Sequence, residues 1–116
     1  MEKNNEEAPV PFHQLATDRL LDLAAHSASA WARADALEEL AARRSEQALT
    51  TFVERLADPS GDVRRVAAEG LEELGNRTAL AALERTLPGE PVERTRLALA
   101  RAIAELRLDP NGASAE

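Results

Sequence analysis

The chain has 116 residues, a length that suits one ordinary domain able to bury a hydrophobic core. Its commonest apolar residues are Ala and Leu, with 24 and 17 copies, and aromatic residues make up only 3%, which favours an all-α protein with closely packed helices. The net charge of −7 argues against nucleic-acid partners and anionic membrane surfaces, and the absence of Cys excludes disulfide frameworks, zinc–thiolate sites and catalytic thiols.

The two ends of the chain have the composition of flexible tails. Residues 1–13 are polar and acidic with two prolines, and they lack the basic start and the apolar stretch of a secretory signal. Residues 108–116 are small, polar and turn-forming. No apolar run approaches the roughly 20 residues that a helix needs to cross a bilayer. We therefore expect a soluble, cytoplasmic protein whose folded part covers residues 14–107.

Between the tails, a shorter and a longer helical pattern alternate three times. The first pair covers about residues 14–44, the second 46–74 and the third 76–107. In the shorter helices the apolar residues recur every three or four positions, as in Leu49, Phe52 and Leu56. One pair cannot bury its apolar faces alone, whereas three stacked pairs can. A period in the low thirties is typical of such helical repeats.

The longer helices repeat one pattern of side-chain size. Each ends in Leu, with spacings of 34 (74 minus 40) and 32 (106 minus 74) residues. Alignment on these residues gives four matched rows: Ala34, Ala68 and Ala100; Ala36, Gly70 and Ala102; Leu37, Leu71 and Ile103; and Leu40, Leu74 and Leu106. The last two rows lie three residues apart within each helix and share one helical face. This agreement predicts three equivalent helix pairs.

A proline marks the start of the second and third long helices. Asp58 is expected to cap the helix and Pro59 to occupy its first position, and Glu90 and Pro91 repeat this arrangement 32 residues later (90 minus 58). The pattern D-P-x-x-x-V-R-x-x-A that starts at Asp58 resembles the second-helix signature of HEAT repeats, particularly the short bacterial kind. The resemblance covers about residues 14–107. It implies a short right-handed α-solenoid of three HEAT-like helix pairs.

The same resemblance implies a ladder of ion pairs between neighbouring repeats. Asp58 and Arg64, together with Glu90 and Arg96, are expected to pair across the stack and to align the repeats. The first repeat has Ala24 and Ala30 at those places. We therefore expect the first repeat to act as an N-terminal cap and the ladder to have two rungs.

The second helix of each pair generally lines the concave side of a HEAT-like stack, so its outward residues are the candidate partner-binding positions. We predict these to be Trp31, Asp35, Glu38, Arg65, Glu69, Glu72, Leu97 and Arg101. Trp and Arg are frequent hot spots of protein interfaces. Two plainer interpretations stay open. Trp31 folds over the first repeat and shields its thin core, or the carboxylates form a merely solvated face.

The sequence predicts no catalytic, cofactor-binding or metal-binding residues. Its two histidines, His13 and His26, are not followed by Glu, and no H-E-x-x-H motif is present. The chain also has no Tyr, no Cys and no Gly-rich phosphate loop. Glu38 and Glu72 are too ordinary as surface carboxylates to indicate an acid–base pair. We therefore expect that the protein is not an enzyme.

We interpret the chain as a non-catalytic protein–protein interaction module or adaptor. It would present a shallow concave surface to a basic or amphipathic peptide or helix of another protein, with no nucleic acid, membrane or cofactor as partner. One alternative is a chromophore or small-ligand handling protein, because short HEAT-like repeats also resemble subunits of bilin chromophore lyases. A second is a self-assembling structural unit, since Leu97, Leu99 and Leu108 leave an apolar C-terminal end for a homodimer or a partner helix.

Overall fold

The computed structural model describes residues 10–108. Within that range the chain forms six α-helices and four single turns of 3-10 helix, without a β-strand. The helices are α1 (Thr17–His26), α2 (Ala30–Ala42), α3 (Leu49–Arg55), α4 (Gly61–Leu74), α5 (Leu80–Thr86) and α6 (Glu93–Leu108). The predicted all-α class is confirmed.

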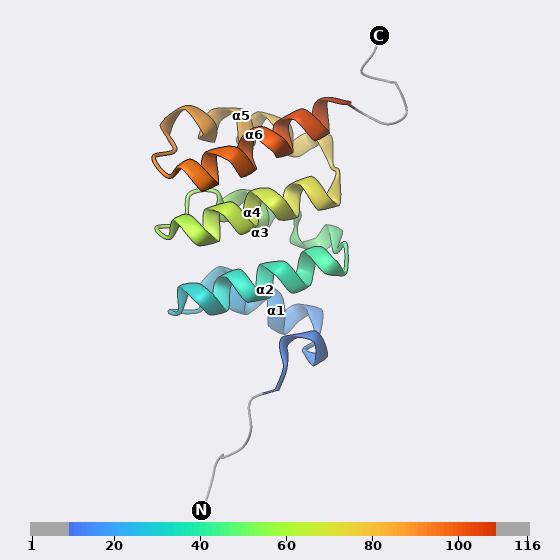
Figure 1. The fold of residues 1–116 in the computed structure, drawn as a ribbon. Coiled ribbons are helices and arrows are strands. Elements are labelled where there is room, and N and C mark those ends of the chain that lie inside the picture. The colour runs from blue at the N-terminus through green and yellow to red at the C-terminus, as the bar shows by residue number, and fades with distance from the viewer. Residues whose placement is uncertain (1–9, 109–116) are drawn as a thin grey trace, which may run out of the picture.

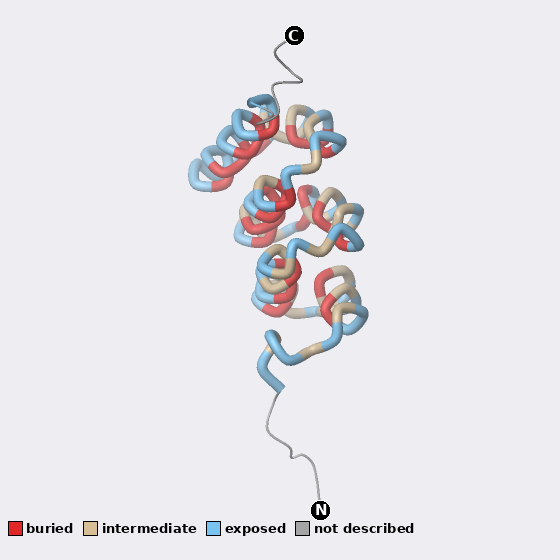
Figure 2. Tube along the Cα trace, turned by 90° about the vertical axis from the view of Figure 1, so that its right-hand side faces the viewer, coloured by how far each residue is buried: buried red, intermediate tan, exposed pale blue. Residues whose placement is uncertain are grey.

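The helices form three pairs that stack one above another (Figure 1). α1 packs on α2, α3 on α4 and α5 on α6, and α4 also lies between α2 and α6. Seen from the side, α2, α4 and α6 make one layer and α1, α3 and α5 make the other (Figure 2). We call the outward side of the α2, α4 and α6 layer the second-helix face. Each pair covers an apolar flank of its neighbour, as the repeat pattern predicted.

The core runs continuously along the stack between the two layers. Buried positions line the inner sides of both layers in Figure 2. Ala and Leu dominate this core, which lets the helix backbones approach closely. Phe52 of α3 is the largest fully buried side chain, and its ring lies against Gly70 of α4, where an added Cβ would overlap it. The absence of a side chain at Gly70 therefore leaves room for the Phe52 ring. The sequence had suggested instead that two helix backbones approach each other closely at this glycine.

The helices α4 and α6 begin two residues later than the sequence predicted. Ser60 is the N-cap of α4, and its hydroxyl accepts from the Val63 N–H at 3.4 Å. Asp58 instead accepts from the Ser60 N–H at 2.9 Å, which closes a turn just before the helix. Glu90 accepts from the Val92 N–H at 3.0 Å in the same way. The expectation that Asp58 caps the helix and Pro59 starts it was wrong, because the carboxylates close the loops that lead into the helices.

The helix starts also correct the alignment of the first repeat. α2, α4 and α6 begin at Ala30, Gly61 and Glu93, so the spacings are 31 (61 minus 30) and 32 (93 minus 61) residues. The first spacing had been read as 34, nearly one helical turn too long. Apolar residues recur every three or four positions in a helix, so a slip of three preserves most of the apolar pattern. Leu40 is therefore equivalent to Leu71, and Leu74 belongs one turn further along α4.

The ends of α2 and α4 support the spacing of 31. Arg44 and Gly75 follow those helices at equivalent places (75 minus 44), and both have left-handed backbone, with φ of 50° and 69°. A left-handed residue is a common helix end, and Gly adopts it without the cost that a Cβ brings.

Replacing Gly75 therefore tests the cost of this backbone conformation directly. Nothing lies within 4 Å of a Cβ added at Gly75, so Gly75→Ala is expected to lower the free energy of unfolding by about 1 kcal/mol through backbone strain alone. Gly89 is the matched control, since its Cβ would also meet open space and its φ is not in the left-handed region. Urea unfolding compares the two variants, and equal losses would contradict the strain at Gly75.

The N-terminal segment before α1 is part of the folded unit. Residues 12–13 had been assigned to a flexible tail, yet η1 (Phe12–Gln14) packs on α2 and Phe12 lies against the core. The Arg43 guanidinium at the end of α2 donates to the carbonyl oxygens of Leu15 at 2.6 Å and His13 at 3.2 Å. At the other end, α6 extends to Leu108. The remainder of the predicted tails, residues 1–9 and 109–116, lies outside the described residues.

Candidate functional site

Two buried ion pairs join neighbouring repeats on the side where each first helix turns into its second. Arg33 of α2 donates from Nε and Nη2 to both carboxylate oxygens of Asp58, each at 2.9 Å. Arg64 of α4 donates in the same way to Glu90, at 2.7 and 2.9 Å. Each guanidinium also donates from Nη1 to a carbonyl of its own repeat, Ser27 or Asp58, at 2.8 Å. These two-pronged contacts fix the spacing of the three pairs.

The ladder differs in its members from the one that the sequence implied. Asp58 pairs with Arg33 of the preceding repeat, so the first repeat does contribute a ladder arginine. Asp58 also pairs with Arg55 at 3.0 Å. The ladder position of the first repeat is Arg33 rather than Ala30, because the true spacing is 31. Arg96 joins no rung in the described part of the chain and pairs with Glu93 of its own helix at 3.4 Å. The two rungs there are Arg33–Asp58 and Arg64–Glu90.

The two rungs are expected to make the stack less stable at acid pH. Burial opposes ionisation of Asp58, but hydrogen bonds from Arg33 and the Ser60 N–H outweigh it and lower its pKa. The hydrogen bond from Arg64 lowers the pKa of Glu90. Because both pKa values are lower in the folded state than in the unfolded state, the stabilisation is complete at neutral pH and is lost as pH falls through the folded-state values.

We expect the urea midpoint to be flat near neutral pH and to fall below about pH 4.5. Glu72 has the opposite effect on stability. Burial raises its pKa, so its protonation at acid pH favours the folded state. This single carboxyl offsets only part of the loss from Asp58 and Glu90. The Glu90→Gln variant removes one titrating rung and is expected to show a shallower fall than the natural chain. A fall of equal steepness in both chains would contradict this account.

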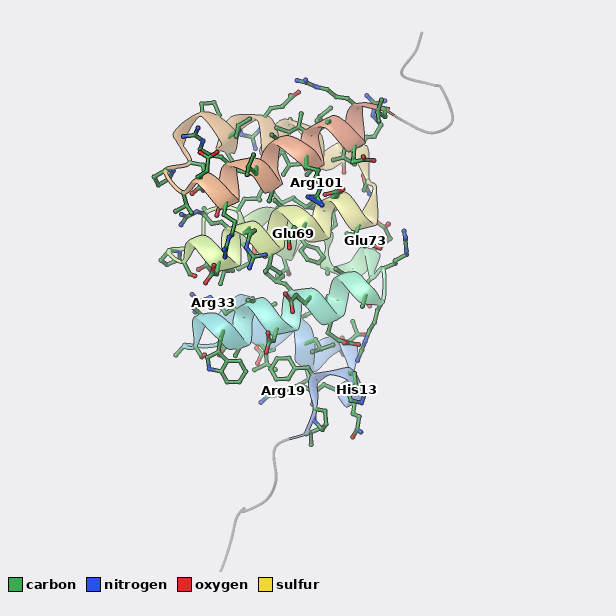
Figure 3. The ribbon with its side chains drawn as sticks, in the orientation of Figure 1. His13, Arg19, Arg33, Glu69, Glu73 and Arg101 are labelled. Atoms are coloured by element: carbon green, nitrogen blue, oxygen red, sulfur yellow. The ribbon has the colours of Figure 1, made fainter. Side chains whose placement is uncertain are left out.

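A groove lies between α2 and α4 on the second-helix face. Its volume is about 340 Å³, its floor is made of small apolar residues and Glu side chains stand on both banks. The lining residues are Glu38, Ala41, Ala42, Val66, Glu69, Gly70 and Glu73. Figure 3 shows Glu69 and Glu73 of α4 on this face. We call this feature the acidic groove.

The neighbouring groove between α4 and α6 has the opposite charge. It is about 350 Å³ in volume and is lined by Arg65, Glu69, Arg94, Leu97, Ala98 and Arg101. The Arg65 guanidinium lies 3.1 Å from the Glu69 carboxylate, and that of Arg101 lies 3.8 Å from the Glu72 carboxylate. The second-helix face therefore carries an acidic half over α2 and α4 and a cationic half over α4 and α6.

Known proteins show the same repeated pattern of paired helices. The family model of HEAT repeats matches residues 17–104. The chain belongs to the HEAT-repeat family. The resemblance read from the Asp58 region is thereby confirmed, and HEAT-repeat domains are typically scaffolds for protein interactions.

The fold of this HEAT-repeat chain resembles part of a larger protein of known structure. The chain is similar to epoxyqueuosine reductase in its crystal structure with an epoxyqueuosine-modified tRNA-Tyr stem loop, with a TM-score of 0.62 and 22% identity. The similarity covers 84% of this chain and 28% of the reductase chain, so this chain spans little more than a quarter of that length. At this identity the likeness shows the fold alone. No curated protein matches the chain by sequence.

The predicted partner-binding residues all belong to α2, α4 and α6 of the HEAT stack but do not form the predicted rows. Trp31 is 67% exposed and its ring centroid lies 6.2 Å from that of Phe12, so the interpretation in which it shields the core was wrong. Leu97 is 61% exposed. With the corrected spacing, the equivalents of Trp31 are Asp62 and Arg94 instead of Arg65 and Leu97.

The acidic groove brings together only two of the predicted residues. Glu38 and Glu69 line it, whereas Asp35 lies near Phe12 and His13 at the N-terminal end of the stack. Glu72 points toward Arg101, and Arg65 is held by Glu69. Sequence reasoning missed Glu73, which lies one turn beyond Glu69 on the same side of α4. The spacing of four between two Glu residues was the available signal.

Two kinds of site are absent from residues 10–108. No group of three or more His, Asp or Glu side chains gathers there in a way that could hold a metal ion. Within the same range, no helix has the length and apolar character needed to cross a bilayer.

Proposed function

We propose that this HEAT-repeat domain is a non-catalytic interaction module whose acidic groove binds a peptide or helix of a partner protein. The partner segment would carry small apolar side chains toward the groove floor and Lys or Arg toward the banks. The lack of Cys supports our expectation of a cytoplasmic location. The observation that carries the proposal is an apolar floor between three carboxylates.

The carboxylates of the acidic groove are available to a partner. Glu38 makes no ion pair within the described residues, while Glu73 pairs with Arg44 at 3.2 Å through side chains that are both mostly exposed. Glu69 is also exposed beside Arg65. Exposed ion pairs contribute about 0 to 1 kcal/mol, so a partner cation displaces them at little cost. The groove therefore offers charge to a basic segment without carrying a strong internal counter-charge.

Trp31 provides an exposed anchor on α2, one of the two helices that line this groove. An exposed Trp supplies a large, rigid apolar surface, and Trp is the residue type most enriched among interface hot spots. It lies in the first turn of α2, the helix that supplies Glu38. A helix or peptide that follows α2 would contact both residues.

Nucleic acid is not the partner that these features favour. The reductase of similar fold was crystallised with a tRNA stem loop, but this chain has a net charge of −7 and carboxylates on both banks of its groove. Phosphate binding depends on clustered Lys and Arg that release counterions. The three arginines of the second groove are interleaved with Glu69 and Glu72.

Affinity capture with the full chain, followed by mass spectrometry, tests the proposal. We expect Trp31→Ala and Glu38→Gln each to weaken capture of the partner by about tenfold or more, with the helical circular-dichroism signal unchanged. Glu54→Gln is the matched control, because Glu54 is exposed on α3 in the other layer. Equal capture by all variants would contradict binding at the acidic groove.

Two other results would favour the alternatives. A coloured or co-purifying small molecule would support chromophore handling. A mass that rises with concentration in light scattering, without any captured protein, would support a self-assembling unit. A partner that is captured stoichiometrically and lost in Glu38→Gln supports the interaction module.

A further inference from the structure

The C-terminal end of the stack carries a ladder arginine that has no rung among residues 10–108. Arg33, Arg64 and Arg96 are each the fourth residue of their helices, α2, α4 and α6. The side chains of the first two are 12% and 15% exposed, because Asp58 and Glu90 of the following repeat cover them. The Arg96 side chain is 51% exposed.

An apolar groove lies further along α6 from this arginine. Ala100 is exposed, although its equivalents one and two repeats earlier, Ala68 and Leu37, are fully buried by the next helix pair. A groove of about 510 Å³ lies here, lined by Leu87, Pro88, Ala100, Ile103 and Ala104, with the Glu84–Arg107 ion pair beside it. We call Arg96 and these five residues the C-terminal end face.

The opposite end of the stack differs in two ways. The segment of Phe12 and Leu15 packs there, and Arg43 holds its carbonyl oxygens. The loop of the first repeat has Ser27 where later repeats have Asp58 or Glu90, because Ser27 precedes Arg33 by six residues as Asp58 precedes Arg64. The loop at that end therefore has no carboxylate at the position of Asp58 and Glu90.

We propose that the C-terminal end face docks a helix pair of a partner protein whose loop presents an Asp or Glu carboxylate to Arg96. This contact repeats the rungs inside the chain, in which a buried carboxylate from the following loop receives two N–H groups of the guanidinium. It also covers the apolar groove as α6 covers α4. The inference does not depend on the acidic groove, which lies between α2 and α4.

A second copy of this chain is a poorer occupant on grounds of charge. Head-to-tail stacking would bring Ser27 to Arg96 and would displace the Phe12 segment. Pairing of two C-terminal end faces would bring together two faces that each carry an Arg96 without a rung in the described residues. Neither arrangement brings a loop carboxylate equivalent to Asp58 or Glu90 to Arg96.

The full chain extended beyond Glu116 by a copy of its own residues 76–108 tests this surface, since the copy brings a second Glu90 loop. We expect amide hydrogen exchange in α6 to slow by about tenfold relative to the natural chain. Arg96→Gln, or Glu90→Gln in the copy alone, is expected to remove most of this slowing. Arg94→Gln, on the same helix but at no ladder position, is the matched control and is expected to keep it.

Two results would overturn the inference. The first is α6 exchange that is unchanged in the extended chain, or a slowing that neither Arg96 nor the copied Glu90 affects. The second is a dimer of the natural chain in sedimentation equilibrium that Ala100→Glu dissociates, because a second copy would then be the occupant. A natural chain that stays monomeric, with slowing that depends on both charges, supports a partner helix pair.

Discussion

The Asp58→Asn variant is expected to lose about 3 kcal/mol of unfolding free energy, the largest effect of any polar substitution in the chain. The fully buried Asp58 carboxylate accepts from Arg33 twice and from Arg55 once, at 2.9 to 3.0 Å. An Asn oxygen can still accept from the Ser60 N–H, so the turn before α4 is kept. The loss therefore reports two guanidinium groups left without their counter-charge.

Urea unfolding of Asp58→Asn and of Asp62→Asn provides the comparison. Asp62 lies in the first turn of α4 with a mostly exposed side chain, so its substitution is expected to change stability by less than about 0.5 kcal/mol. An Arg33→Gln change in the Asp58→Asn background should cost far less than in the natural chain, because the two residues share one interaction. Equal costs in the two backgrounds would show that Arg33 and Asp58 do not form a rung.

The Phe52→Ala variant is expected to lose about 4 kcal/mol of unfolding free energy. Phe52 is the largest fully buried side chain of a core made mostly of Ala and Leu. Small neighbours have little reach to fill the space that its ring leaves, so the cavity should persist. Thermal and urea unfolding both measure this loss, and a Phe52→Leu variant with a smaller loss separates cavity size from aromatic character.

A companion change at Gly70 tests which side chain this glycine accommodates. Gly70→Ala alone is expected to destabilise the fold by about 2 kcal/mol, because its Cβ would overlap the Phe52 ring. In the Phe52→Ala background the same change should be neutral or stabilising by up to about 1 kcal/mol, since Ala favours helix over Gly. Equal destabilisation in both backgrounds would place the obstacle elsewhere than in the Phe52 ring.

The fold was predictable from the sequence because it depends on local periodicity. Ala and Leu recurring every three or four residues predicted each helix, and the matched sizes of the second and third long helices gave their correct spacing of 32. The register of the first repeat was not predictable in this way. A slip of three residues leaves Leu37 and Leu40 in apolar rows, so only the capping residues Ser29 and Ser60 and the helix ends distinguish the two alignments.

The ladder and the candidate site depend on contacts between repeats, which a single sequence specifies weakly. Asp58 pairs with Arg33, 25 residues earlier, and no local pattern marks that partner once the register is misplaced. Glu38 and Glu69 were found because both are outward residues of long helices. Their joint position on one groove with Glu73, and the opposite charge beside Leu97, follow from the stacking of α2, α4 and α6.

Amide hydrogen exchange of the full chain, alone and in complex with its captured partner, tests the acidic groove most directly. We expect exchange to slow in residues 30–42 and 61–74, the two helices that line the groove, and to stay unchanged in α1, α3 and α5. Slowing confined to α1, α3 and α5 would contradict the proposal, because those helices form the layer that faces away from the groove.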